Sequence, residues 1–205
     1  MSTVLSLLIF FFAVIIHEYA HGWVAWKLGD STARFMGRLT LNPIAHIDPI
    51  GTIFLPLFLI ITHSPVLFGW AKPVPVDFFN LNNPKRDMIW VGIAGPAANI
   101  IFAIALSLLF KIPILTASQL AVSVITAAIM ANLVLAVFNL LPIPPLDGSR
   151  VAMGFLPYNI GAEYAKIEPY GFIIIFGLLW LGVINTIIWP VVIFLARLLG
   201  VNLGM

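Results

Sequence analysis

Long apolar stretches alternate with short polar ones along this chain. Residues 2–26, 88–110 and 117–141 are each long enough to cross a bilayer as a helix, because about 20 residues span the roughly 30 Å hydrocarbon core. Trp23 and Trp26, at the end of the first stretch, are typical of the membrane interface. The pattern therefore predicts three membrane-spanning helices.

Two further apolar stretches are less regular. Residues 50–68 are interrupted by two prolines and a histidine, and the proline-rich residues 69–85 that follow indicate extended chain at the membrane interface. Residues 170–199 are long enough for one span and part of another, with a break expected near Asn185 and Pro190. The sequence leaves open whether this last stretch forms one or two membrane segments.

One polar connection has the pattern of a strand. Within the segment GRLTLNP, Leu39 and Leu41 alternate with Thr40, and Gly37 and Pro43 bound the alternation. Alternation of this kind between turn-forming residues predicts a short β element.

Composition indicates a membrane protein. The 205 residues are 61% hydrophobic and only 9% charged, whereas a soluble domain is about 45–50% apolar and about 25% charged. A soluble domain of this size cannot hide so much apolar surface from water. A water-soluble enzyme and a disordered chain are therefore excluded. We expect a single all-α domain over residues 1–205, a multi-pass helical bundle in the lipid bilayer.

Charge and cysteine content narrow the candidate chemistry. Ten basic and eight acidic residues give a formal net charge of +2, which argues against nucleic-acid binding because no basic stripe accompanies it. The chain has no cysteine, so disulfides, thiolate metal sites and cysteine nucleophiles are excluded. Any metal site must use His, Asp, Glu or backbone oxygen.

The first predicted span contains His17, Glu18 and His21, in the order HEYAH. Ionisable side chains inside a membrane helix are costly and by default mark functional sites. Positions i and i+4 lie on one face of a helix, so both imidazoles can reach one metal ion. Glu18, which directly follows His17, can act on a metal-bound water. A chance match with hydrogen-bonded core histidines does not explain why the pattern falls within an apolar helix.

A catalytic zinc ion takes three protein ligands and leaves one position open, so a third ligand must come from elsewhere. His46 and His63 lie in proline-flanked contexts typical of interfacial or capping histidines, and Glu163 and Glu168 indicate a solvated face. Asp147 follows the third span in NLLPIPPLDG, whose prolines stiffen the backbone. On residue pattern alone, Asp147 is either the third ligand or part of an ordinary Asp-Gly turn.

Three motifs in this order resemble the site-2 protease family of intramembrane metalloproteases. They are HEYAH on an early membrane helix, GPAAN (residues 95–99) on the next clear span, and NLLPIPPLDG (residues 139–148) after the third. The resemblance covers residues 2–154. It implies that His17, His21 and Asp147 bind one zinc ion per chain and that Glu18 is the catalytic base.

The same resemblance implies that the substrates are transmembrane proteins. Asn139 would contact the substrate backbone, and Asn99 would contribute to the substrate site while helping Gly95 to shape it. Unlike larger family members, the chain is expected to have no PDZ insertion, no CBS-type regulatory domain and no membrane helix before HEYAH. The segments GRLTLNP, AHIDPIGT and GWAKPVPV resemble the compact bacterial and archaeal group. Regulation and substrate selection are therefore expected to differ from those of the larger members.

Basic residues predict the orientation in the membrane. Lys27, Arg34 and Arg38 follow the first span and no basic residue precedes it, so the positive-inside rule places this loop in the cytoplasm. A single crossing by residues 50–68 would deliver Asp147 to the outer side, away from the histidines. Non-helical backbone at membrane depth is allowed where protein or water surrounds it. We therefore expect residues 50–68 to be re-entrant and the active site to lie toward the cytoplasmic side of the cell membrane.

These expectations combine into one function, an intramembrane zinc metalloendopeptidase acting as in regulated intramembrane proteolysis. Residues 37–42 could pair, strand to strand, with an unwound substrate. A metal-ion transporter would also bury His and Asp, but such proteins usually repeat their ligand motifs across two halves, and no repeat is visible. A scaffold without activity would tend to have lost Glu18, which is present.

Overall fold

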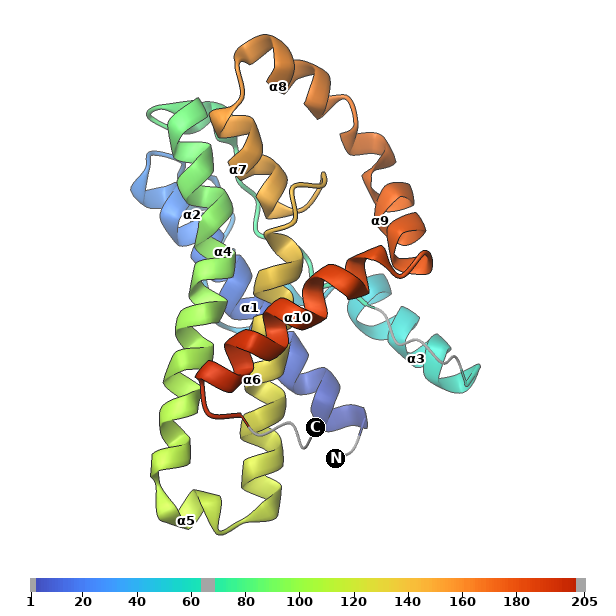
Figure 1. Cartoon of the computed structure of the whole chain (residues 1–205). Coiled ribbons are helices and arrows are strands. Elements are labelled where there is room, and N and C mark those ends of the chain that lie inside the picture. Colours follow the sequence, from blue (N-terminus) through green and yellow to red (C-terminus); the bar gives the residue numbers. More distant parts are fainter. Residues whose placement is uncertain (1–2, 64–68, 202–205) are drawn as a thin grey trace.

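The computed structural model describes residues 3–63 and 69–201, and the described residues form helices and connecting segments without a strand (Figure 1). Three long helices run through the molecule: α1 (Thr3–Lys27), α4 (Pro84–Ser107) and α6 (Gln119–Asn139). Within the described ranges, three helices are long and apolar enough to cross a membrane, and a bent pair near the C-terminus brings the number to four if it is one span. The three predicted spans are therefore present as helices of sufficient length.

Helix α4 lies at the centre of the bundle. It packs against α1, α6 and α7 (Asp147–Phe155), and α6 also contacts α1 and α10 (Val183–Leu198). The turns η4 (Leu108–Lys111) and α5 (Pro113–Thr116) join α4 to α6 at the end of the bundle opposite to α2 (Thr32–Phe35) (Figure 1). The chain therefore enters α7 on the side where α1 ends, which brings its first residue close to α1.

The expected β element is not confirmed. Residues 39 and 40 form bends, and residues 41 and 42 lead from them into the 3-10 turn η1 (Pro43–His46). Side chains satisfy the backbone here: the Thr40 carbonyl accepts from His46 Nε2 at 2.8 Å, and the Asn42 N–H donates to Thr40 Oγ1 at 3.1 Å. A strand needs a partner ladder, and in the described part of the chain no second strand supplies one.

The apolar segment after η1 turns back on itself. It consists of the π-helical turn η2 (Pro49–Phe54) and helix α3 (Leu55–Ile61), which projects sideways from the bundle (Figure 1). The Trp70 N–H donates to the Gly51 carbonyl at 3.1 Å, and Thr52 Oγ1 donates to the Trp70 carbonyl at 2.8 Å. The chain thus returns to the place where the segment began, which is the geometry that a re-entrant segment requires.

The C-terminal helices are bent. After α8 (Tyr158–Ala165), the turn η5 (Glu168–Tyr170) leads into α9 (Gly171–Trp180), and the helical segments on either side of Gly182 meet at 77°. Gly182 adopts a left-handed conformation with φ of 71°, which costs glycine little because it has no Cβ. The break predicted near Asn185 and Pro190 is wrong, because both residues lie inside α10.

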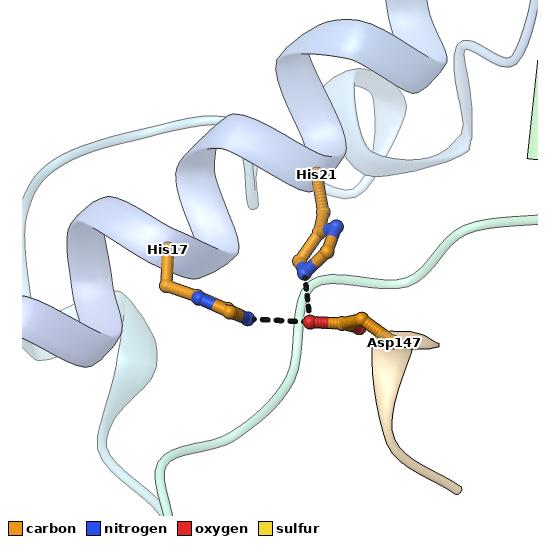
Figure 2. A group of neighbouring side chains, drawn as sticks. All are labelled: His17, His21 and Asp147. Carbon is orange, nitrogen blue, oxygen red and sulfur yellow. Dashed lines mark hydrogen bonds and ion pairs between the residues drawn. The ribbon is translucent and has the colours of Figure 1, made fainter. Parts of the chain in front are cut away.

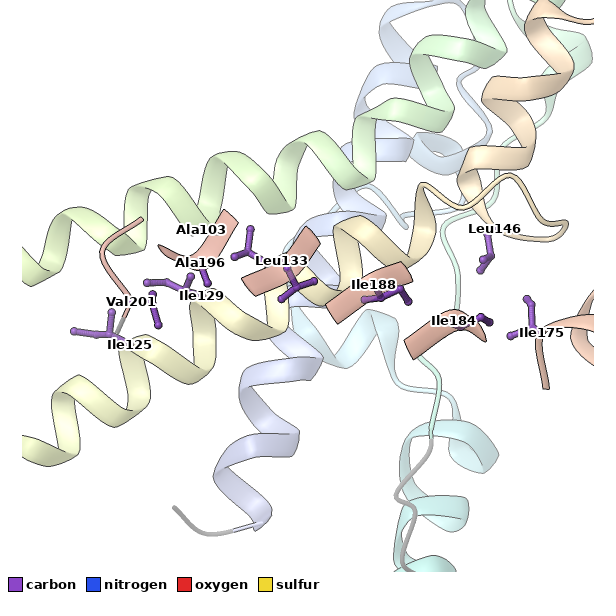
Figure 3. Close-up of a cluster of buried hydrophobic side chains, with 11 residues drawn as sticks. Ala103, Ile125, Ile129, Leu133, Leu146, Ile175, Ile184, Ile188, Ala196 and Val201 are labelled. Carbon is purple, nitrogen blue, oxygen red and sulfur yellow. The ribbon is translucent and has the colours of Figure 1, made fainter. Parts of the chain in front are cut away.

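A hydrophobic core supports the loop that carries Asp147. Figure 3 shows this elongated cluster of buried side chains from α4, α6, α9 and α10, with Leu146 at the same end as Ile175 and Ile184. Leu146 immediately precedes Asp147, so burial of its side chain fixes the backbone from which the carboxylate projects. The members are Ala103, Ile125, Ile129, Leu133, Leu146, Ile175, Ile184, Ile188, Val192, Ala196 and Val201.

Candidate active site

His17, His21 and Asp147 meet at one point of the bundle. His17 Nε2 lies 2.9 Å and His21 Nε2 lies 3.2 Å from the same oxygen, Asp147 Oδ2 (Figure 2). One nitrogen or oxygen atom from each residue lies within 4.8 Å of the other two, and both histidines are buried. Two imidazole nitrogens and a carboxylate oxygen are a donor set that suits zinc. The three residues could therefore hold a metal ion.

Gly95 on α4 keeps the space beside the two imidazoles open. A Cβ atom at this position would lie 2.4 Å from His21 Nε2 and 2.5 Å from His17 Nε2. One turn earlier, a Cβ at Gly92 would lie 3.0 Å from the Asp147 carbonyl oxygen. The two glycines let α1 and α7 approach α4 closely, and a side chain at position 95 would collide with both imidazoles.

The outer nitrogen of each imidazole is held by a hydrogen bond. His17 Nδ1 lies 2.6 Å from Asn99 Oδ1, and His21 Nδ1 lies 2.7 Å from the Val91 carbonyl oxygen. Both partners are acceptors, so each Nδ1 carries the proton. In the neutral form of each imidazole the Nε2 lone pair then faces Asp147, which is the orientation a metal ligand requires, whereas a protonated imidazole donates from Nε2 to the Asp147 carboxylate.

Asn99 is itself held by a second buried amide. It is fully buried and donates through Nδ2 to the Ala13 carbonyl at 3.0 Å and to Asn132 Oδ1 at 2.7 Å. Asn132 in turn donates to the Ala128 carbonyl at 2.8 Å. The amide of Asn99 is therefore hydrogen-bonded to His17 and Ala13 of α1 and to Asn132 of α6, and its contribution to a substrate site remains a prediction.

Asn132 is a site residue that the sequence reasoning missed. It belongs to none of the three motifs, but it is an amide in the middle of an apolar span, seven positions before Asn139. A polar side chain at such a position is rare and needs a partner. That signal could have singled it out, although the partner could not be named without the fold.

Glu18 points to a different neighbour from the histidines. Its Oε2 accepts a hydrogen bond of 2.7 Å from the Val74 N–H, in the extended residues 71–76. Glu18 is not one of the three residues whose ligand atoms converge at Asp147. Its role as the catalytic base remains a prediction.

The carboxyl group of Asp147 is held in its charged form. Burial opposes ionisation, but the charge of His21 and hydrogen bonds from His17 and His21 outweigh it and lower the pKa of Asp147 to about 2. A carboxylate is the form that ligates a metal ion.

The other candidate ligands lie elsewhere. His46 is fully buried and bonded to Thr40, whereas His63 ends α3 in an exposed turn. Glu163 pairs with Lys166 and Glu168 with Arg150, each at 2.5 Å. In the ranges that the structure describes, none of the four joins the cluster at Asp147.

Asn139 lies at the end of α6 and is half-buried. Its Nδ2 donates to the Leu135 carbonyl at 3.0 Å, a bond within the helix. Its contact with a substrate remains a prediction.

Comparisons with known proteins bear on this arrangement. Residues 110–182, which include Asp147, match Peptidase family M50. The protein named "Putative zinc metalloprotease YwhC" of Bacillus subtilis is 40% identical over 182 residues, which cover 85% of this chain and 80% of the relative. The chain belongs to peptidase family M50, the site-2 protease family. This M50 member is accordingly a protease, and its apolar helices make it a multi-pass membrane protein.

More distant M50 relatives cover most of the chain as well. Proteins named "Putative zinc metalloprotease Rip2" from Mycolicibacterium smegmatis and Mycobacterium tuberculosis are 28% and 29% identical, each over 93% of this chain and 72% of the relative. No solved structure matches the chain.

Proposed function

We propose that this M50 protease is a zinc metalloendopeptidase that cleaves membrane proteins in or near their transmembrane segments, as in regulated intramembrane proteolysis. The observation that carries the proposal is the convergence of His17, His21 and Asp147, within 4.8 Å, between helices of spanning length. The names of the relatives as zinc metalloproteases support zinc as the metal. Residues 1–205 act as a single protease domain in this proposal.

In this proposal His17 and His21 bind one zinc ion through Nε2, and Asp147 binds it through a carboxylate oxygen. When bound, zinc supplies a Lewis acid that polarises the scissile carbonyl and lowers the pKa of a water molecule toward about 7. Asn99 and the Val91 carbonyl keep the two imidazoles in the ligating tautomer.

Glu18 is the general base of the proposed reaction. Its Oε2 is held by the Val74 N–H, which leaves Oε1 to take the proton of the attacking water. Glu18 then delivers this proton to the leaving amine. The carboxylate is oriented before the substrate binds, so it loses little freedom during the reaction.

The substrate backbone must be extended for cleavage, because a helix hides its carbonyls from attack. Within residues 37–42, the backbone groups of Leu39 and Leu41 have no hydrogen-bond partner in the described part of the chain, and they are proposed to pair with such a segment. Asn139, at the end of α6, is proposed to contact the same backbone. The substrate would then be held on both sides of the scissile bond.

The active site is proposed to lie toward the cytoplasmic side of the cell membrane. The positive-inside rule places the end of α1, with Lys27 and Arg34, in the cytoplasm. The hydrogen bonds that join Gly51 and Thr52 to Trp70 support a re-entrant segment between α1 and α4. Asp147 then emerges on the same side as the histidines.

The test compares purified variants on a mixture of synthetic transmembrane peptides in detergent micelles with zinc, with cleavage sites read by mass spectrometry. Glu18→Gln keeps the shape of the side chain but is not basic, so cleavage should fall by a factor of about 10² or more while bound zinc is retained. Glu163→Gln, an exposed change of the same type, should cleave like the wild type. His17→Ala and Asp147→Asn should lose most of the zinc.

Two outcomes would overturn this proposal. Cleavage by Glu18→Gln at the wild-type rate would make Glu18 a structural residue. Zinc flux into liposomes, with no peptide cleaved, would instead indicate the metal-ion transporter.

A further inference from the structure

A buried arginine holds the segment that binds Glu18. Arg38 is only 8% exposed, and its Nη2 donates to the Lys72 carbonyl at 2.7 Å and to the Pro73 carbonyl at 3.1 Å. Its Nη1 donates to the Ala45 carbonyl. In the described ranges, no carboxylate forms an ion pair with this guanidinium. A buried cation is costly unless hydrogen bonds satisfy it. The carbonyls satisfy its two terminal nitrogens, whereas the buried Nε has no partner among the described residues.

The segment has few other donors with which to hold its place. Pro73 and Pro75 have no N–H. The Lys72 N–H donates to the His46 carbonyl at 2.9 Å, and the Val74 N–H donates to Glu18. The amide that reaches Glu18 therefore lies between two prolines, directly after the two carbonyls that Arg38 binds.

The local fold directs Arg38 toward this segment. Helix α2 ends with the Gly37 N–H donating to the Arg34 carbonyl at 3.1 Å and the Arg38 N–H donating to the Ala33 carbonyl at 2.8 Å. Gly37 has φ of 65°, the left-handed conformation that closes a helix in this way. The turn reverses the chain after α2 and buries Arg38.

We propose that Arg38 is a positioning residue for the Glu18 carboxylate. By binding the carbonyls of Lys72 and Pro73, it fixes the Val74 N–H against Glu18 Oε2. Arg38 touches neither the metal ligands nor the reacting atoms, so its loss should change the orientation of Glu18 and leave zinc binding intact. The inference rests on the proposed function, in which Glu18 is the base.

Hydrogen exchange of the purified protein tests the contact without using activity. In Arg38→Gln the Val74 amide should exchange about tenfold faster than in the wild type, because one hydrogen-bonded support is lost. Glu18→Ala, which removes the acceptor, should have the same effect on this amide. Arg34→Gln, which changes an exposed arginine of α2 four positions before Arg38, is the matched control and should leave the amide unchanged. Unchanged exchange at Val74 in Arg38→Gln would overturn the inference.

Kinetics on the peptides that the wild type cleaves test the consequence. Arg38→Gln should lower kcat by about tenfold or more, with KM and zinc content unchanged. Arg38→Lys should recover part of this loss, because a lysine ammonium can replace some, but not all, of the hydrogen bonds that the guanidinium donates. Val74→Pro removes the N–H and should lower kcat similarly. Val76→Pro is its control, because Val76 donates no hydrogen bond in the described part of the chain.

The double variant decides between positioning and a merely structural role. Arg38→Gln combined with Val74→Pro should be no slower than Val74→Pro alone, because both changes remove the same contact. Additive losses, or zinc lost together with activity, would overturn the inference.

If the wild type cleaves none of the peptides, the proposed function fails, while the exchange rate of the Val74 amide still tests whether Arg38 supports the hydrogen bond to Glu18. If Arg38→Gln does not fold, Arg38→Lys and Val74→Pro carry the same test.

Discussion

His17 Nδ1 and Asn99 Oδ1 lie 2.6 Å apart, which ties a proposed metal ligand on α1 to an amide on α4. Asn132 on α6 extends the connection, so three helices hold one imidazole in place. His21 is held differently, by the backbone carbonyl of Val91. The orientation of His17 can therefore be changed by side-chain substitution, whereas that of His21 depends on the path of α4.

Asn132→Leu should weaken zinc binding although Asn132 does not touch the proposed ligands. The change removes one of the two acceptors of Asn99 Nδ2 and leaves only the Ala13 carbonyl, so the amide holds His17 less firmly. Loss of an outer-shell partner typically costs about 10- to 100-fold in metal affinity, and zinc competition with a chelating dye measures it. Asn185→Leu, an exposed change on α10, is the control. Wild-type affinity in Asn132→Leu would contradict the role of the amide chain.

Gly95→Ala should abolish most zinc binding. The added Cβ would lie 2.4 Å from His21 Nε2, which is too close for both imidazoles to keep their positions. Gly177→Ala is the control, because a Cβ there meets no atom within 4 Å and alanine favours the helix by about 1 kcal/mol. Metal content after purification is the measurement. Full zinc content in Gly95→Ala would show that the site does not need the open space.

The stability of the protein should fall below about pH 4 in part through Asp30. Burial raises the pKa of Asp30, but hydrogen bonds from the Thr32 hydroxyl, the N–H groups of Thr32 and Asp77, and the Asn80 amide lower it further than burial raises it. The Asp30 carboxylate therefore binds a proton more readily in the unfolded chain than in the folded protein. Its contribution to stability is fully present above the ordinary carboxyl pKa of about 4, and it is lost as the pH falls through the lower pKa of the folded state.

Asp30→Asn tests this dependence. The variant should lose about 1–3 kcal/mol at pH 7, and its stability should change less than that of the wild type as the pH falls. Unfolding midpoints in detergent between pH 7 and pH 3 measure both effects, with Glu163→Gln as an exposed control. Parallel curves for Asp30→Asn and the wild type would show that Asp30 is not the group responsible.

Single cysteines test the orientation of the bundle, because the natural chain has none. Phe35, Phe79 and Tyr158 are 86%, 92% and 80% exposed, and Ile114, in α5 at the opposite end of the bundle, is 79% exposed. With a membrane-impermeant thiol reagent on intact cells, only Ile114→Cys should be labelled. The other three should react after permeabilisation. Labelling of Phe79→Cys from outside would mean that residues 50–68 cross the membrane once.

Sequence reasoning succeeded where the deciding property is local. Length and hydropathy are properties of a continuous stretch, so α1, α4 and α6 could be predicted without the fold. It is not confirmed at residues 39–41, because a strand depends on a partner that the described residues do not supply. It misplaced the C-terminal break. Proline is a known helix breaker, so the sequence pointed to Pro190, but the chain breaks at Gly182, whose left-handed turn separates α9 from α10.

The HEYAH spacing alone placed His17 and His21 on one helical face, since i and i+4 lie one above the other in any α-helix. Packing between distant segments was needed for the rest. It brought Asp147 Oδ2 to within 3.2 Å of both imidazoles across 126 and 130 positions of chain, where the residue pattern had left an Asp-Gly turn equally open. It also joined Asn132 to Asn99 and Arg38 to the segment that binds Glu18. Such contacts depend on how closely the helices pack against one another. Small side chains permit close packing, but the sequence does not tell which helices they bring together.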